Sequence, residues 1–206
     1  VVTDPRGQVL VDHVSFTLHR GEILAIAGVQ GNGQTELTEA ILGLQSKVHG
    51  SISLEGNELV GESTRQVLDA GVGFVPEDRT DDGLVGTFSI AENLMLDRST
   101  GEPFVKWGTL QLDELARFAE ERVAEFDVRT QGITQQAGRL SGGNQQKVVL
   151  ARELSRDLAL FVAAQPTRGL DVGADQEIYA RIGATRSCGR SSAAARRSPS
   201  SRCCSP

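Results

Sequence analysis

The first thirty residues combine two hydrophobic patterns that predict the start of an α/β fold. Apolar residues take near-alternate positions from Val9 to Leu18, which predicts a half-exposed strand. Residues 23–27 are continuously apolar, as in a strand buried on both faces of a parallel sheet. We therefore expect an antiparallel strand first and a parallel core strand second.

A helix is expected directly after the second of these strands. Residues 28–33 contain three glycines and predict a tight turn. Helical spacing follows at Leu37, Ala40, Ile41 and Leu44. Strand, glycine-rich loop and helix therefore form one unit.

The rest of the chain alternates between strand and helix signals. Ser89 and Glu92 have the spacing of a capping box, which predicts a helix start there. The other expected elements are a strand and hairpin over 50–57, a buried strand over 72–75, helices over 112–126 and from 141 to 154, and a buried strand over 158–163.

Composition narrows the class of protein. The chain has 206 residues and a net charge of −6, so unspecific attraction to nucleic acid or to an anionic membrane surface is not expected. Its longest apolar run, 158–164, has seven residues, whereas a membrane-spanning helix needs about twenty. These values predict a cytoplasmic globular protein.

The last 24 residues differ from the rest of the chain. From Gly183 to Pro206 there are five Arg and seven Ser but no acidic residue and no large apolar one, so nothing there can form a core. All three cysteines lie here and leave open a metal or disulfide cluster, although no His or carboxylate accompanies them. We expect one folded domain over 1–182, with net charge −11, and a disordered or aberrant tail over 183–206.

Residues 28–35 have the G-x-x-x-x-G-x-T frame of a phosphate-binding loop between a strand and a helix. Its lysine position holds Gln34, so a charged phosphate contact becomes a neutral one. A structural glycine turn is the alternative. The candidate nucleotide-binding residues are Gly28, Gln30, Gly31, Asn32, Gly33, Gln34 and Thr35, with Thr35 also a weak candidate metal ligand.

A second glycine motif makes a nucleotide-handling function more specific. Residues 140–147, Leu-Ser-Gly-Gly-Asn-Gln-Gln-Lys, resemble the signature motif of ATP-binding cassette (ABC) ATPases, and residues 166–171 resemble that family's D-loop region with Asp171. The simpler alternative is that Ser141 caps a helix with its hydroxyl. The resemblance covers residues 9 to about 182 and is closest to the second cassette of double-cassette proteins that power importers for simple sugars; residues 163–171 are similar to the nucleoside-importing branch.

This resemblance implies a fold and a set of partners. The implied fold is a P-loop NTPase with a RecA-like parallel sheet core, an antiparallel β flank and a helical insertion at about 85–152, truncated at the C-terminus. The implied partners are another cassette, normally on the same longer chain, and membrane permease subunits, with no nucleic acid. It also implies a position on the inner face of the cell membrane. In the family, the signature residues of one cassette, here Ser141, Gly142, Gly143 and Asn144, complete the ATP site of the other.

Several positions depart from a hydrolytic cassette. The family's Mg²⁺-binding Asp and catalytic Glu correspond to Ala164 and Gln165, which supply neither a metal ligand nor a general base. The three histidines lie at positions 13, 19 and 49, so none can serve as the family's later switch histidine. We therefore expect no intact catalytic residue, and ATP with Mg²⁺ mainly at the partner's composite site.

Other family features remain open in the sequence. Glu77 resembles a switch-loop residue, and the alternative is a solvated charged turn. Phe16 is more consistent with the core than with an adenine platform, and Phe88, Leu94 and Trp107 are more consistent with the core than with a permease groove.

The expected function is an ATP-binding subunit of an importer for simple sugars or nucleosides, whose own site is hydrolysis-deficient. Two rivals are an autonomous ATPase and a defunct fragment with an unpaired sheet edge. A third, a cassette acting on nucleic acid, is disfavoured by the acidic charge.

Overall fold

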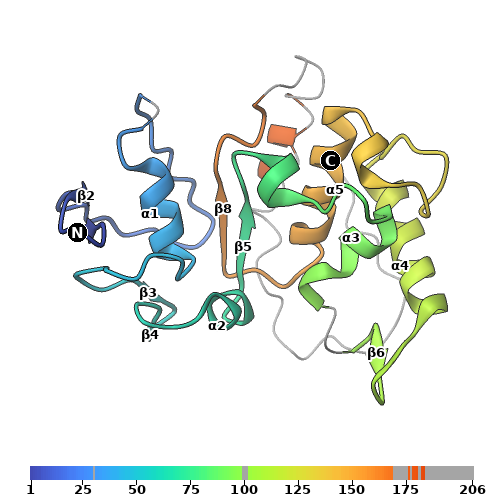
Figure 1. Ribbon diagram of the computed structural model, residues 1–206, viewed down its shortest axis with the longest axis horizontal. Helices are drawn as coiled ribbons and strands as arrows, with labels where there is room; N and C mark the ends of the chain where they lie inside the picture. Colours follow the sequence, from blue (N-terminus) through green and yellow to red (C-terminus); the bar gives the residue numbers. More distant parts are fainter. Residues whose placement is uncertain (30, 99–101, 169–175, 177, 181, 184–206) are drawn as a thin grey trace.

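The computed structural model describes all residues except 30, 99–101, 169–175, 177, 181 and 184–206 (Figure 1). The pair β5 and β8 stands between α1 with its short strands and the helices α3, α4 and α5 (Figure 1). The strands are β1 (Val2–Thr3), β2 (Val9–Val11), β3 (Ser53–Leu54), β4 (Asn57–Glu58), β5 (Val72–Val75), β6 (Val105–Lys106), β7 (Thr109–Leu110) and β8 (Leu160–Ala163). The α-helices are α1 (Gln34–Ile41), α2 (Thr64–Asp69), α3 (Ile90–Met95), α4 (Leu112–Glu125) and α5 (Gly142–Leu154), and short helical turns cover Arg79–Gly83, Leu96–Arg98 and Ala137–Arg139.

The parallel sheet consists of β5 and β8 in the described part of the chain. Val72 faces Leu160 and Val75 faces Ala163 in register. Gly73 allows the close packing of this pair, because a Cβ there would lie 2.8 Å from Leu158 Cδ1. The prediction for 72–75 is confirmed, and β8 begins two residues later than the pattern predicted.

The antiparallel flank is built from short pairs. Strands β1 and β2 pair through Val2 and Val11, and β3 and β4 form the predicted hairpin. The hairpin turn places Glu55 at φ 50° and Gly56 at φ 86°, the left-handed conformation that a two-residue hairpin loop requires. The predicted antiparallel β flank is therefore present.

The segment before the phosphate loop corrects two predictions. The half-exposed strand is limited to β2, and residues 23–27 form no strand. Ile23, Leu24 and Ile26 are 55%, 44% and 52% exposed. A parallel core strand needs neighbours along its edges and cover on both faces. No described segment pairs with residues 23–27, so an apolar run alone was insufficient to make them a strand.

The main hydrophobic core lies among α3, α4 and α5. Ile90, Leu94 and Leu150 are fully buried in it, and α4 contributes Leu115 and Ala119. Ser89 and Glu92 form the predicted capping box at the start of α3. The helices expected over 112–126 and 141–154 are confirmed as α4 and α5. None of the described helices has the length and hydropathy needed to cross a bilayer.

Candidate functional site

The glycine-rich loop leads directly into α1. Gly33 is the N-cap of this helix, with φ 92°, and Gly31 has φ 87°. A Cβ on Gly33 would lie 2.7 Å from the carbonyl oxygen of Leu10, so both backbone angle and space require glycine there. The loop thus has the glycine-dependent helix start expected of a phosphate loop, although no strand directly precedes it in the described part of the chain.

The Gln34 side chain folds back over this loop. Its Nε2 donates to the carbonyl of Val29 at 3.2 Å, and its Oε1 accepts from the backbone N–H of Asn32 at 3.2 Å. A side chain on Gly28 would collide with this amide. One of the backbone N–H groups available to a phosphate is therefore already bonded to a neutral side chain of the same loop.

The donor set of the loop fits a phosphate better than a metal ion. Gly31 and Asn32 are exposed, and a Cβ on Gly31 would meet nothing within 4 Å, so an anion has room there. The Thr35 hydroxyl is exposed, whereas Ala164 offers no side-chain ligand. No group of three or more His, Cys, Asp or Glu able to hold a metal occurs among the described residues. These residues do not fit a resident Mg²⁺.

The end of β8 carries the two positions expected to be catalytic. The N–H of Ala164 donates to the carbonyl of Val75 at 2.9 Å, which continues the β5–β8 ladder. Gln165 is exposed and has φ 45°, so the chain turns sharply there. Neither side chain can accept a proton from water at neutral pH.

Residues 77–79 connect the end of β5 to the turn after β8. The Glu77 carboxylate pairs with the guanidinium of Arg168, and Arg79 Nη1 donates to the carbonyl of Arg168 at 2.9 Å. Asp78 accepts hydrogen bonds from the hydroxyl and N–H of Thr80 and from the N–H of Asp81, and these bonds lower the pKa of Asp78. Glu77 is therefore ion-paired with the turn after β8, and its role as a switch-loop residue stays a prediction.

Ser141 is the N-cap residue of α5, with φ −64° and ψ 155°, but its side chain makes no cap hydrogen bond. This corrects the prediction that its hydroxyl accepts a helix N–H. Instead Oγ accepts from Nδ2 of Asn144 at 2.9 Å, and Asn144 Oδ1 accepts from the N–H of Arg129 at 2.8 Å. Because the Ser141 hydroxyl bonds to the Asn144 amide, the N–H groups at the helix start remain available to other acceptors.

Helix α5 is held firmly behind this motif. Every residue from 145 to 153 is buried. Arg152 Nη1 donates to the carbonyl of Gly83 at 2.9 Å, and Glu153 accepts from the N–H of Phe74 on β5 at 3.2 Å. Lys147 donates to the carbonyl of Asp127 at 3.0 Å.

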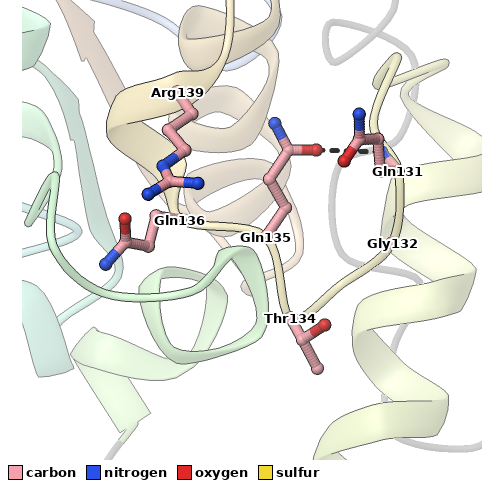
Figure 2. A pocket seen from close by; sticks show the side chains of 6 residues that line it. All are labelled: Gln131, Gly132, Thr134, Gln135, Gln136 and Arg139. Atoms are coloured by element: carbon pink, nitrogen blue, oxygen red, sulfur yellow. Dashed lines mark hydrogen bonds between the residues drawn. The ribbon is translucent and has the colours of Figure 1, made fainter.

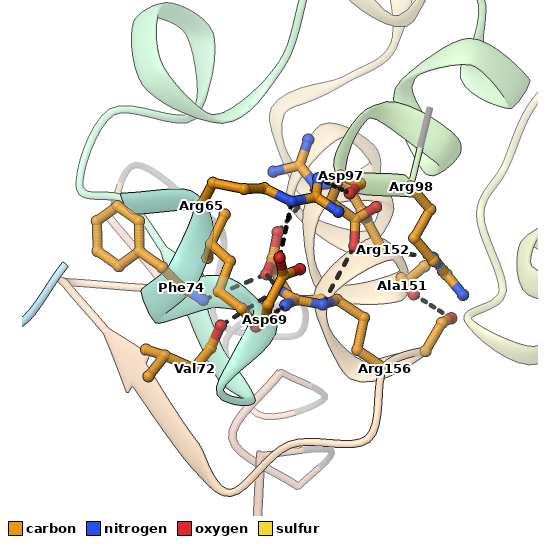
Figure 3. Close-up of polar contacts among 12 residues, drawn as sticks. Arg65, Asp69, Val72, Phe74, Asp97, Arg98, Ala151, Arg152 and Arg156 are labelled. Atoms are coloured by element: carbon orange, nitrogen blue, oxygen red, sulfur yellow. Dashed lines mark hydrogen bonds and ion pairs between the residues drawn. The ribbon is translucent and has the colours of Figure 1, made fainter. Parts of the chain in front are cut away.

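A cluster of charged side chains fixes the C-terminal end of α5 (Figure 3). Arg156 lies 3.2 Å from a carboxylate oxygen of Asp97 and donates to the carbonyl of Val72 at 3.2 Å. It also donates to the carbonyl of Leu68 at the end of α2. Side-chain exposure is 12% for Arg156 and 9% for Asp97, so their attraction is little weakened by water. The signature helix is thereby tied to β5 and α2.

A wide polar hollow lies in the loop before α5 (Figure 2). Its volume is about 590 Å³, and Gln135 anchors the loop by accepting from the N–H of Gln131 at 2.9 Å. The lining residues are Gln131, Gly132, Thr134, Gln135, Gln136 and Arg139. The lining residues directly precede Ser141 in sequence and lie far from the phosphate loop along the chain. No motif in the sequence predicted this hollow.

The remaining candidates have mixed outcomes. Gln30 and Asp171 lie outside the described residues. Phe16 is 48% exposed, which corrects its expected core position, and Phe88 is 42% exposed. Trp107 is 98% exposed, whereas Leu94 is fully buried as expected.

Five polar residues complete the comparison between sequence and structure. His13, His19 and His49 are all exposed. Sequence reasoning missed Arg79 and Arg168, because their partners lie 63 and 91 residues away. The charged Glu-Asp-Arg run was the one signal that could have drawn attention to this contact.

Comparisons with known proteins agree with the motifs. The family model described as ABC transporter matches residues 11–168. The nucleoside import ATP-binding protein NupA of Lactococcus lactis subsp. cremoris is 43% identical over 88% of this chain and 36% of its own length. The guanosine import ATP-binding protein NupO of Bacillus subtilis is 41% identical over 92% of this chain and 37% of its own length. The glucose import ATP-binding protein TsgD13 of Haloferax volcanii is 46% identical over 87% of this chain and 33% of its own length. The chain spans about a third of the length of these relatives.

Solved structures show the same fold at low identity. A nucleotide-free ATP-binding cassette from an ABC transporter superimposes with a TM-score of 0.72 at 22% identity, covering 87% of this chain and 72% of that one. The dimeric post-hydrolysis state of the cassette MJ0796 with ADP and Pi superimposes with a TM-score of 0.65 at 21% identity, covering 81% of this chain and 70% of that one. The P-loop NTPase cassette architecture is thus shared.

Proposed function

The chain belongs to the ABC transporter family, and we propose that it is an ATP-binding part of an importer for simple sugars or nucleosides, lending its signature motif to a partner cassette. One observation carries the proposal: Ser141 is exposed and Gly142 and Gly143 are half-buried at the start of a buried helix, while Ala164 and Gln165 hold no carboxylate.

The start of α5 can bind an anion without rearrangement. The Ser141 hydroxyl and the N–H groups of Gly142 and Gly143 lie at the positive end of a 13-residue helix. Asn144 orients the Ser141 hydroxyl by donating to Oγ, which leaves the hydroxyl hydrogen free to turn to an outside oxygen. We propose that these groups contact the terminal phosphate of ATP held by a competent partner.

The chain's own loop has a different role in the proposal. Gln34 binds the loop backbone and supplies no charge, and the residues after β8 cannot activate water. The own site therefore holds ATP weakly and does not hydrolyse it. ATP with Mg²⁺ acts mainly at the composite site, where the partner supplies the metal ligands and general base.

The partners follow from this division of roles. The proposed partners are a competent cassette, normally on the same longer chain, and permease subunits, with the protein peripheral on the inner face of the membrane. Relatives named as nucleoside, guanosine and glucose import ATP-binding proteins support this assignment. Residues 85–152, which contain α3, α4 and most of α5, are the proposed helical subdomain. The acidic net charge of −6 supports a function without nucleic acid.

The test is ATP turnover by the chain assembled with a competent cassette. Ser141→Arg fills the exposed motif, and we expect turnover to fall by about 10²–10³-fold, the usual effect of losing a preorganised phosphate contact. Ser46→Arg is the matched control, since Ser46 is also exposed but lies after α1. Full turnover with Ser141→Arg would contradict the proposal. Mg²⁺-dependent turnover by the chain alone, lost with Thr35→Ala, would support an autonomous ATPase instead.

A further inference from the structure

Arg79 lies between the turn after β8 and the start of α5. Its Nη1 donates to the carbonyl of Arg168 at 2.9 Å. On its other side, a Cβ on Gly142 would lie 2.5 Å from Arg79 Nη2 and 3.2 Å from Cζ. One guanidinium therefore contacts both segments, which are 26 residues apart in sequence at Gly142 and Arg168.

The turn is held at two points by the same short segment. Glu77 pairs with the side chain of Arg168, and Arg79 binds its backbone carbonyl. Two contacts two residues apart fix both the position and the direction of Arg168. A displacement of this turn must then move the Arg79 guanidinium, which rests against Gly142.

The location of Arg79 does not stabilise α5 by itself. A cation beside a helix N-terminus is repelled by the helix dipole. Arg79 Nε is also buried and makes no hydrogen bond within the described residues. The contact with Gly142 therefore has an unfavourable local electrostatic effect. Local stabilisation does not explain the contact, but the connection of two segments by Arg79 does.

We propose that Arg79 is a positioning residue that couples the turn at 165–168 to Gly142, so that the chain's own degenerate site sets the geometry of the signature motif. The inference rests on the proposed function, because it assigns a regulator to the phosphate contacts of Ser141 and Gly142. It also gives a reason for glycine at position 142: a side chain there displaces the Arg79 guanidinium and breaks the connection.

A readout without a partner tests the physical coupling. In the full chain without nucleotide, Arg79→Ala should raise hydrogen exchange of the Gln145 N–H, which bonds to the carbonyl of Ser141 at 2.9 Å in the first turn of α5, by several-fold and leave 148–153 unchanged. Arg117→Ala is the matched control, because Arg117 is exposed and, among the described residues, pairs only with Glu114 and Glu121 on its own helix, α4. Unchanged exchange at Gln145 would overturn the proposal. Arg79→Lys, which keeps the charge but lacks the two-sided guanidinium, should give an intermediate value if Arg79→Ala fails to fold.

A double-mutant cycle tests the functional consequence in the assembly with a competent cassette. Arg79→Ala should lower turnover by about tenfold when Gly142 is present and by less than about twofold when Gly142→Ala has already broken the contact. Equal losses in both backgrounds would overturn the coupling. If Ser141→Arg leaves turnover intact while Arg79→Ala still raises exchange at Gln145, the donation of the signature motif fails and the coupling stands.

Discussion

The phosphate loop at 28–33 and the signature motif at 141–144 both place glycines at a helix start, but the structure that supports them differs. The residues preceding the loop are exposed, and α1 buries only Ala40. The signature motif forms the N-cap and first turn of α5, whose residues 145–153 are all buried. Backbone N–H groups select a phosphate well only when the structure behind them holds them still.

The difference teaches that a glycine motif alone does not define a working site. At the loop, Gln34 bonds to the carbonyl of Val29 and to the N–H of Asn32, and so occupies an N–H that a phosphate would use. At α5, Asn144 bonds to Ser141 and Arg129 and leaves the helix N–H groups available. A side-chain amide therefore occupies a backbone N–H at the phosphate loop, whereas at the signature motif it leaves the helix N–H groups available.

The largest expected effect compares helix α5 with the residues that precede the phosphate loop. Leu150→Ala removes a fully buried side chain from α5 and should lower the free energy of unfolding by about 2–5 kcal/mol. Leu24→Ala is the matched variant before the phosphate loop, where the side chain is 44% exposed, and should change it by less than about 0.5 kcal/mol. Urea denaturation followed by circular dichroism measures both. Equal losses would remove the distinction between the supports, and the absence of a cooperative transition in the unmodified chain would favour a defunct fragment.

The next largest effect concerns Gln34 and the phosphate loop at 28–33. Gln34→Lys replaces a neutral donor by a charged one and should tighten ATP binding by about tenfold, or roughly 1.4 kcal/mol. Hydrolysis should not appear, because Ala164 and Gln165 remain. Calorimetric titration of the chain with ATP measures the change. Gln111→Lys adds the same charge at the start of α4 and serves as control; if it tightens binding equally, the effect is general electrostatics and the role given to Gln34 is wrong.

The smallest effect lies in the helix cap of α3. Hydrogen bonds from Ser89 lower the pKa of Glu92 below its ordinary value of 4.5. A lowered pKa in the folded state contributes stability above pH 4.5 that is lost as the pH falls through the folded-state pKa. Ser89→Ala should cost about 1 kcal/mol at neutral pH, and the difference from the unmodified chain should shrink in acid.

The control for this prediction is the cap of α2. Ser63 forms the same capping box with Gln66, which does not titrate. Ser63→Ala should therefore cost a similar amount with no dependence on pH between 3 and 7 beyond that of the whole chain. A loss for Ser89→Ala that stays constant down to pH 3 would show that Glu92 does not carry the effect.

The sequence predicted elements whose stability is local. The Ser89 capping box, the hairpin turn at 55–56 and the amphipathic pattern of α4 all depend on residues within one or two turns of each other. The strand expected at 23–27 failed because its formation depends on distant strands that the apolar run does not specify.

The candidate site shows the same limit. Both glycine motifs are visible as short patterns, because each is a contiguous turn and helix start. The bond from Asn144 to Ser141 joins neighbours at helical spacing, but the contacts of Arg79 join segments 63 and 89 residues apart. Nothing in a single sequence tells which distant carbonyl an arginine will reach.

The hairpin of β6 and β7 has a practical consequence for spectroscopy. It carries the chain's single tryptophan, Trp107, at its tip, where the side chain is 98% exposed. The indole is already in water in the native state, so its intrinsic fluorescence will scarcely register denaturation. The same emission will report cleanly on any polypeptide that docks against this tip and shields the ring from solvent.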